Sequence, residues 1–205
     1  MDLREHWNNK YSTSPESELG WYEASSDAIL DLIPRDDIDP DDQIFIAGAG
    51  SSIIVDELFE AGFEHIIAND LSQFALDRLI ERNKGKDLQA NSNSLTVEGS
   101  IILDGKIKLW IDRAVLHFFH SAEEIEAYRK NLMANTSEDS YILLAEFAEN
   151  GAEVCNALPV KRYSLEMMKD FLGDEFELLK HFTYEYINPR GGSRPYNYAL
   201  FKRVL

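Results

Sequence analysis

The sequence has very little cysteine and no long apolar run. Its 205 residues include a single cysteine, Cys155, so no disulfide can form within the chain. A lone thiol is typical of a reducing compartment, and we expect a cytoplasmic location. No run approaches the roughly 18 consecutive apolar residues of a membrane helix. The leading MDLREHWNNKY lacks the apolar core of a signal peptide. These absences argue against a disulfide-stapled scaffold and a membrane-spanning protein.

Basic residues are also scarce. Lysine and arginine together number 20, against 37 aspartates and glutamates, which gives a formal net charge of -17 at pH 7. Proteins that bind DNA or RNA draw most of their affinity from Lys and Arg on phosphates. We therefore expect no nucleic-acid partner and no membrane partner. The acidic excess favours solubility or adaptation to salt, and an acidic face for a basic partner is the other interpretation.

The stretch QIFIAGAGSSIIVDELFEAGFEHIIAND reads as a strand, a tight turn, a helix and a second strand. The short apolar run 43–47 is typical of a strand covered on both faces. Gly48-Ala49-Gly50 permits a sharp turn and the close approach of a ligand. Apolar residues then recur at helical spacing up to Gly62, which ends the helix, and 65–69 forms the second strand. The pattern predicts one β-α-β unit of a parallel sheet.

Asp70 follows the second strand, 20 residues after Gly50. In an open parallel sheet this spacing places a carboxylate where the ribose of a nucleoside ligand can lie, beside a helix start with unpaired amides. The other interpretation is local, because Asp70 and Ser72 can both cap the next helix. The spacing predicts nucleoside binding, and the rest of the chain has to decide which nucleoside.

Strands and helices continue to alternate along the chain. The N-cap Ser72 predicts a helix to Asn83, and Ser121-Ala-Glu-Glu124 is a capping box. The long connection 147–163 has no obvious structure, which is often a sign of function, and its Cys155 and Arg162 could line a pocket for a planar or acidic molecule. We also expect a helix at 24–33 before Pro34, strands at 95–103, 106–111 and 140–147, a helix at 164–172, and a hairpin of 176–186 with 196–203.

Candidate reacting groups follow the expected strand 106–111. The carboxyl ends of such strands face the ligand crevice, so Asp112, Arg113 and His117 are candidates for the reacting centre. Asp112 and Arg113 could equally form a structural ion pair, and His117 could be a buried, hydrogen-bonded histidine.

Five motifs occur in order along nearly the whole chain. They are His6-Trp7 with Tyr11, AGAGSS at 47–52, NDLS at 69–72, WIDRAVLHF at 110–118 and LPVKRY at 158–163. Together they resemble the class I S-adenosylmethionine-dependent methyltransferases and, within these, the small bacterial proteins related to the thiopurine methyltransferase group. The resemblance implies an α/β fold, a three-layer Rossmann-like sandwich with a seven-stranded, mostly parallel sheet and a C-terminal antiparallel hairpin. Residues 1–205 would form one domain, with 1–34 as a helical cap over the cofactor site.

The resemblance implies S-adenosyl-L-methionine as the cofactor and no metal. The two glycines of the turn would wrap its methionine part, and Asp70 would hold the ribose hydroxyls. Asp112 and Arg113 would flank the methyl sulfonium, with aromatic residues of the leading segment covering the site. The implied cofactor-binding set is Trp7, Tyr11, Trp21, Ala47, Gly48, Ala49, Gly50, Asp70, Leu71, Ser72, Asp112 and Arg113.

The sequence departs from the family pattern at three places. The acid that commonly precedes the first glycine of the turn is here Ile46, and Ser51-Ser52 replaces the usual third glycine. The acid often found after the third strand is also missing, with Glu98 and Ser100 as possible stand-ins. Each departure bears on the affinity for the cofactor.

The resemblance predicts methyl transfer to a small-molecule or protein acceptor. A sulfonium is already an activated methyl donor, so the protein mainly aligns the groups and excludes water. Where the acceptor needs a base, Asp112 or His117 is the catalytic candidate. Two alternatives stay open. One is a non-catalytic protein that kept the fold, which Ile46 suggests. The other is a nicotinamide-dependent oxidoreductase, which the glycine turn and Asp70 would serve equally.

Overall fold

The core of the protein is a seven-stranded sheet in the order β3-β2-β1-β4-β5-β9-β8. The computed structural model describes residues 2–205. Strands β1 to β5 are parallel, and β9 runs antiparallel between β5 and β8. The predicted fold class and C-terminal hairpin are confirmed. The strands are β1 Gln43–Ala47, β2 His65–Asn69, β3 Asp87–Asn91, β4 Ile107–Arg113, β5 Thr136–Phe147, β8 Phe176–Ile187 and β9 Ser193–Arg203.

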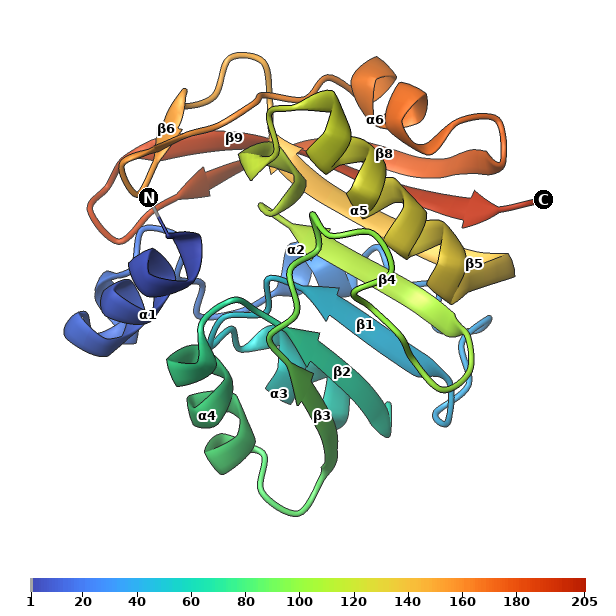
Figure 1. Ribbon diagram of the computed structural model, residues 1–205, viewed down its shortest axis with the longest axis horizontal. Coiled ribbons are helices and arrows are strands. Elements are labelled where there is room, and N and C mark those ends of the chain that lie inside the picture. Colours follow the sequence, from blue (N-terminus) through green and yellow to red (C-terminus); the bar gives the residue numbers. More distant parts are fainter. Residues whose placement is uncertain (1) are drawn as a thin grey trace.

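Helices cover both faces of the sheet, which gives three layers (Figure 1). Side chains alternate along a strand, so Leu109 and Ile111 of β4 enter the apolar cluster under α3 and α4. Trp110, between them, enters the other cluster, under α5 and α6. The helices are α1 Leu3–Thr13, α2 Asp27–Leu30, α3 Ile54–Glu60, α4 Gln73–Arg82, α5 Ala122–Asn135 and α6 Leu165–Leu172, with 3-10 turns η1 Glu16–Glu18 and η2 Leu116–Phe118.

Several helices begin at the predicted N-cap residues. The Ser72 hydroxyl accepts a hydrogen bond from the amide of Ala75 at 3.2 Å, and Ser121 with Glu124 forms the complete capping box. These bonds satisfy amides that have no partner inside a helix. The starts of α4 and α5, which frame the strand ends, are therefore fixed by short local signals.

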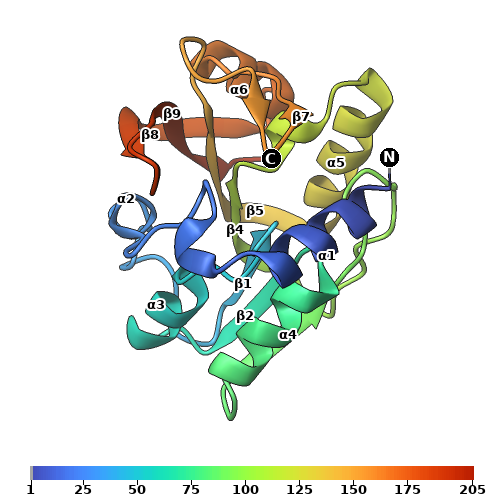
Figure 2. The same ribbon diagram turned by 90° about the vertical axis from the view of Figure 1, so that its left-hand side faces the viewer.

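The N-terminal segment lies across the carboxyl ends of the strands, beside α4 (Figure 2). Arg4 donates to the carbonyl of Leu71 at 3.1 Å, and the Ser72 hydroxyl donates to Asn8 Oδ1 at 3.0 Å. Helix α2 is shorter than the predicted 24–33. It begins only at Asp27, after the N-cap Ser26, whose amide donates to Glu57 Oε2 at 2.9 Å, and it ends at Leu30. The N-terminal segment and the carboxyl ends of the strands together enclose a cavity.

The third strand is β3, which corrects the prediction of a strand at 95–103. Strand β3 is the edge of the sheet and pairs only with β2, so it is polar and lacks an apolar run. Residues 95–103 form a loop over the sheet. Asn131 donates to the carbonyl of Leu95 at 3.0 Å, and Asn135 donates to that of Ile101 at 3.0 Å.

The connection 147–163 also has more structure than expected. It contains a small antiparallel pair, β6 Val154–Cys155 and β7 Leu158–Pro159. Asn156 and Ala157, with φ of 50° and 65°, make the tight turn between them. Left-handed residues at both turn positions are typical of a two-residue hairpin.

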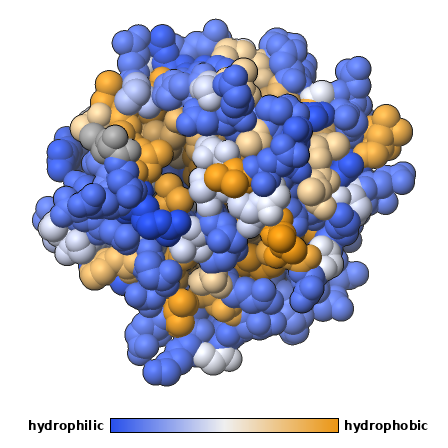
Figure 3. All heavy atoms as spheres, in the orientation of Figure 1, coloured by the Kyte–Doolittle hydropathy of each residue, from blue (hydrophilic) through white to orange (hydrophobic). Residues whose placement is uncertain are grey.

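Hydrophilic residues cover most of the face shown in Figure 3, as the acidic composition leads one to expect. Within residues 2–205, no helix has the length and apolar character required to cross a membrane.

Candidate functional site

A cavity of about 360 Å³ lies at the carboxyl ends of β1, β2 and β4, under the N-terminal segment. Its walls come from the ends of these strands, the turn after β1, the loop 93–96 and the segment containing Trp7 and Trp21. This is the position at which open α/β sheets bind their ligands. The volume is within the usual range of small-molecule sites, roughly 300 to 1,000 Å³.

The turn after β1 is packed so tightly that it needs its two glycines. Gly48 and Gly50 have φ of 57° and 53°. A Cβ on Gly48 would lie 2.2 Å from Cγ2 of Val115, and one on Gly50 would lie 2.1 Å from the Tyr11 hydroxyl. Any side chain at either position would therefore displace a neighbour. Ala47, Gly48 and Ala49 line the cavity, whereas Gly50 is covered by Tyr11.

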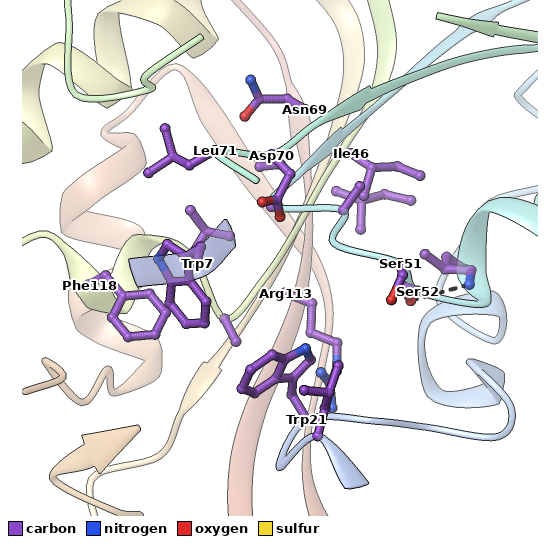
Figure 4. Close-up of a pocket in the computed structure, with 18 of the residues that line it drawn as sticks. Trp7, Trp21, Ile46, Ser51, Ser52, Asn69, Asp70, Leu71, Arg113 and Phe118 are labelled. Atoms are coloured by element: carbon purple, nitrogen blue, oxygen red, sulfur yellow. Dashed lines mark hydrogen bonds between the residues drawn. The ribbon is translucent and has the colours of Figure 1, made fainter. Parts of the chain in front are cut away.

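The Asp70 carboxylate joins this turn to the end of β2. Its Oδ2 accepts from the amide of Gly50 at 2.8 Å, and its Oδ1 accepts from the amide of Ser72 at 2.7 Å. The side chain still faces the cavity (Figure 4), and burial raises its pKa to about 6. Leu71 lines the cavity as well, while Ser72 is fully buried and serves as the cap of α4. The acid and the glycine turn thus share one cavity wall, as predicted.

Aromatic side chains of the N-terminal segment, together with Phe118, cover the cavity. The Trp7 ring makes edge contacts with Trp21 and Phe118, at centroid distances of 5.5 and 5.4 Å (Figure 4). The Trp21 indole N–H donates to the Tyr11 hydroxyl at 3.1 Å. Burial raises the pKa of Tyr11 well above its usual value, so the hydroxyl stays neutral. The result is a mostly apolar cover in which the Trp21 indole N–H and the Tyr11 hydroxyl are paired with each other.

Arg113 and Glu23 form an ion pair on the cavity wall. Arg113 Nη2 lies 2.8 Å from Glu23 Oε1, and the two side chains are 12% and 13% exposed. Arg113 Nε donates to the Tyr198 hydroxyl at 3.1 Å, and the guanidinium lies over the rings of Tyr186 and Tyr196. Burial raises the pKa of Glu23, and the neighbouring Arg113 opposes that rise. This pair of opposite charges was not predicted, although Glu23 directly follows the aromatic Trp21-Tyr22.

Asp112 points to the other face of the sheet and does not line the cavity. Its carboxylate accepts from the Tyr128 hydroxyl at 2.6 Å and from the amides of Val115 and Leu116 at 2.9 and 3.2 Å. Alternation along β4 sends Arg113 to the cavity and Asp112 under α5. The structure therefore corrects the assignment of Asp112 as a catalytic or cofactor-binding residue, and gives it the role of holding the turn after β4.

His117 is also fully buried and outside the cavity wall. Its Nδ1 lies 3.1 Å from Oε2 of Glu146, and burial lowers its pKa to about 3, so the ring is neutral. The catalytic assignment of His117 is therefore corrected. The structure supports the other interpretation, in which His117 is a buried residue of the core. Glu146 was missed, although a charged residue inside the apolar run YILLAEF was a visible signal.

The loop after β3 contributes to the cavity through residues other than the predicted ones. Asn93, Ser94, Leu95 and Thr96 line it. Glu98 instead pairs with Lys130 at 2.9 Å on the surface, and the Ser100 hydroxyl donates to the carbonyl of Ser94 at 2.6 Å. Glu98 and Ser100 therefore do not line the cavity, and their assignment as stand-ins is corrected. The third strand was predicted later in the chain than β3 lies, so the loop that follows it was misplaced as well.

Of the residues expected in the connection 147–163, only Cys155 lines the cavity within the described chain. Arg162 pairs with Glu153 at 3.2 Å, outside the cavity wall. Cys155 Sγ lies 3.6 Å from Nη1 of Arg194, and burial raises the pKa of the thiol. The thiol is thus a small uncharged part of the wall.

Comparisons with solved structures identify the fold. No family model and no curated protein matches the sequence. An S-adenosylmethionine-dependent methyltransferase from Anabaena variabilis is 16% identical with a TM-score of 0.75, over 98% of this chain and 93% of that one. The 1,6-didemethyltoxoflavin-N1-methyltransferase of Burkholderia thailandensis, solved with S-adenosylhomocysteine, is 15% identical with a TM-score of 0.72, over 99% and 88%. Magnesium protoporphyrin IX methyltransferase from Synechocystis, solved with bound S-adenosylmethionine, is 13% identical with a TM-score of 0.71, over 99% and 98%. This chain therefore has the class I S-adenosylmethionine-dependent methyltransferase fold.

Proposed function

We propose that the protein is an S-adenosylmethionine-dependent methyltransferase that acts on a small molecule. The observation that carries the proposal is that Asp70 and the glycine turn share one cavity at the strand ends. The methyltransferase structures with bound cofactor or product support it through their common fold. The narrower resemblance to proteins of the thiopurine methyltransferase group rests on the sequence motifs, and the cytoplasmic location on the cysteine content.

The residues present fit this cofactor. The Asp70 carboxylate retains lone pairs beyond the two amides it accepts from, so it can also accept from ribose hydroxyls. Leu71 and Leu95 supply apolar wall for a purine ring. Since Ile46 replaces the usual acid, the cavity carboxylate that we assign to the methionine ammonium is Glu16, which lies 3.7 Å from Arg82.

The cofactor would supply an activated methyl group, and the chain would supply position and a dry cavity. Trp7, Trp21 and Phe118 form an aromatic cover that would exclude water from the cavity. Excluding water strengthens each polar contact inside the cavity and protects the reactive donor. Asp112 acts only indirectly, because it accepts from the amides of the turn that presents Val115 to the cavity, and His117 is buried outside the cavity wall.

A calorimetric titration with S-adenosylhomocysteine tests the proposal. Wild-type protein should bind it saturably, and Asp70→Ala should bind at least about 30-fold more weakly, because hydrogen bonds to a charged group contribute about 2 kcal/mol. Asp77→Ala is the matched control, since Asp77 is exposed on α4 and outside the cavity.

A labelled-methyl assay with thiols, amines and cell extract should then show transfer by the wild type. Absence of heat with either form of the cofactor would reject the proposal. Binding without transfer to any acceptor would favour the non-catalytic alternative, and tight binding of NAD instead would favour the oxidoreductase.

A further inference from the structure

One carboxylate of the cavity has no role in holding the proposed cofactor. Among the described residues that line the cavity, the carboxylates are Glu16, Glu23 and Asp70. Asp70 is assigned to the ribose and Glu16 to the methionine ammonium, which leaves Glu23. The Glu23 side chain is paired with Arg113 through Oε1 and is still 13% exposed on the cavity wall.

The same ion pair argues against a charged acceptor. The cations on the described cavity wall are Arg82 and Arg113. Arg82 is bound to Asp56, with its Nη2 at 2.7 Å from Oδ2, and Arg113 is bound to Glu23 at 2.8 Å. An anionic acceptor would lose its hydration without gaining an unpaired cation, and burying a charge in this way is strongly unfavourable. A neutral molecule meets no such obstacle.

The walls around Glu23 favour a flat ring. Trp21 is two residues from Glu23 and contacts Trp7, and the guanidinium of Arg113, the partner of Glu23, lies over the ring of Tyr196. Trp7, Trp21 and Tyr196 all line the cavity, and aromatic faces and edges pack well against another ring.

We propose, on the basis of the methyl transfer proposed above, that Glu23 is the general base for a small planar acceptor with a neutral N–H or O–H on its aromatic ring. The lone pair of the acceptor atom forms the bond to the methyl carbon while the carbon–sulfur bond breaks and its electrons stay on sulfur. The N–H or O–H proton passes to the Glu23 carboxylate and then to solvent. Charge and atoms balance without a further reactant.

The surroundings of Glu23 suit this role. Arg113 of β4 keeps the carboxylate ionised, whereas burial and Glu57 of α3 raise its pKa and make it a better base. The other titratable groups that face it are the hydroxyls of Tyr186, Tyr196 and Tyr198, whose pKa values burial raises, so they stay neutral.

The test compares three acceptors and the variant Glu23→Gln. Phenol carries a neutral O–H, pyridine is a neutral ring whose nitrogen carries no proton, and benzoate is an anion. With labelled S-adenosylmethionine, Glu23→Gln should lower kcat for phenol about 100-fold, the usual order for a lost base. Its effect on pyridine should be under about 3-fold, because the ring nitrogen has no proton to give up. The acidic limb of the wild-type pH profile with phenol should disappear in the variant.

Binding measurements separate a base from a residue that merely shapes the cavity. The affinity for S-adenosylhomocysteine should be the same in Glu23→Gln, in wild type and in the matched control Glu18→Gln, whose side chain is exposed on the same segment. Phenol, but not benzoate, should bind to the complex of the wild type with S-adenosylhomocysteine. Formate should restore part of the activity of Glu23→Ala by filling the vacated carboxylate position.

Equal losses with phenol and pyridine, or a parallel loss of S-adenosylhomocysteine affinity, would overturn the role of Glu23. A wild-type complex that does not take up phenol would overturn the acceptor class. Both results presuppose binding of S-adenosylhomocysteine, so they differ from failure of the proposed function, in which that binding is absent.

Discussion

Two groups of titratable side chains lie at the carboxyl ends of β4 and β5. One group lines the cavity, and the other is completely buried. Arg113, with Glu23, faces the cavity. Asp112, with His117 and Glu146, is sealed under α5 with no exposure. In the sealed group burial raises the pKa of Glu146 to about 8 and lowers that of His117 to about 3, so both are uncharged at neutral pH. Only the cavity group can exchange protons with a ligand.

The comparison shows that a position at the carboxyl end of a strand is not enough to make a residue functional. Asp112 and Arg113 are adjacent in sequence and both end β4, yet one supports the fold and the other faces the cavity. The face of the sheet makes this difference, because consecutive strand residues point in opposite directions. The predictions below test whether the two groups are as separate as their surroundings indicate.

The largest expected effect is that of Asp112→Ala on stability. The change leaves the Tyr128 hydroxyl and the amides of Val115 and Leu116 without their acceptor. Buried donors left unpaired should lower the free energy of unfolding by about 3 kcal/mol, and Tm by about 8 °C for a chain of this size. Urea and thermal unfolding measure this, with Asp77→Ala as control. A fully stable variant with abolished S-adenosylhomocysteine binding would place Asp112 in the cavity group instead.

The next effect is that of Glu146→Gln on the pH dependence of stability. With a folded-state pKa of about 8 against an ordinary 4.5, Glu146 contributes stability that is complete below pH 4.5 and is lost as the pH rises through 8. Glutamine cannot ionise, so the variant should gain about 1 to 2 kcal/mol over wild type at pH 8 and nothing near pH 4.5. Urea unfolding at several pH values measures this difference.

The matched control for Glu146→Gln is Glu149→Gln, which changes an exposed glutamate near the end of the same strand. A loss of stability at every pH in Glu146→Gln would show that Glu146 is ionised and hydrogen-bonded in the native protein.

The smallest expected effect concerns the cofactor and Asp70. The raised pKa of about 6 means that Asp70 is ionised at pH 7 and protonated as the pH falls below 6. Protonation removes an acceptor for the ribose hydroxyls, so affinity for S-adenosylhomocysteine should fall by up to about tenfold per pH unit below 6. By linkage, the free energy of unfolding of the free protein should rise as the pH falls through 6, because the native state binds the proton of Asp70 more tightly than the unfolded state does. Calorimetry should show this pH dependence in wild type and not in Asp70→Asn.

Local signals in the sequence predicted much of the fold. The glycine turn, Asp70 and the serine caps depend on contacts within a few residues or on the geometry of one β-α-β unit, and each lies where it was expected. Strand β3 was misplaced because an edge strand need not be apolar.

The composition of the cavity was predicted less well. Glu23 reaches Arg113 from a segment 90 residues away in the chain, and no pattern in either segment indicates the other. Asp112 and His117 looked functional because their position at a strand end is visible in the sequence, whereas the direction of their side chains depends on strand register and on helix packing.

The distribution of the three tryptophans has a practical consequence. Trp7 and Trp21 line the cavity, whereas Trp110 is completely buried beside Phe45. Indole emission responds to polarity and to stacked rings, so occupation of the cavity should alter the signal of two fluorophores while the third stays constant as an internal reference. Ligand binding can therefore be followed by the intrinsic tryptophan fluorescence of the native protein, and ligand screening requires no attached dye.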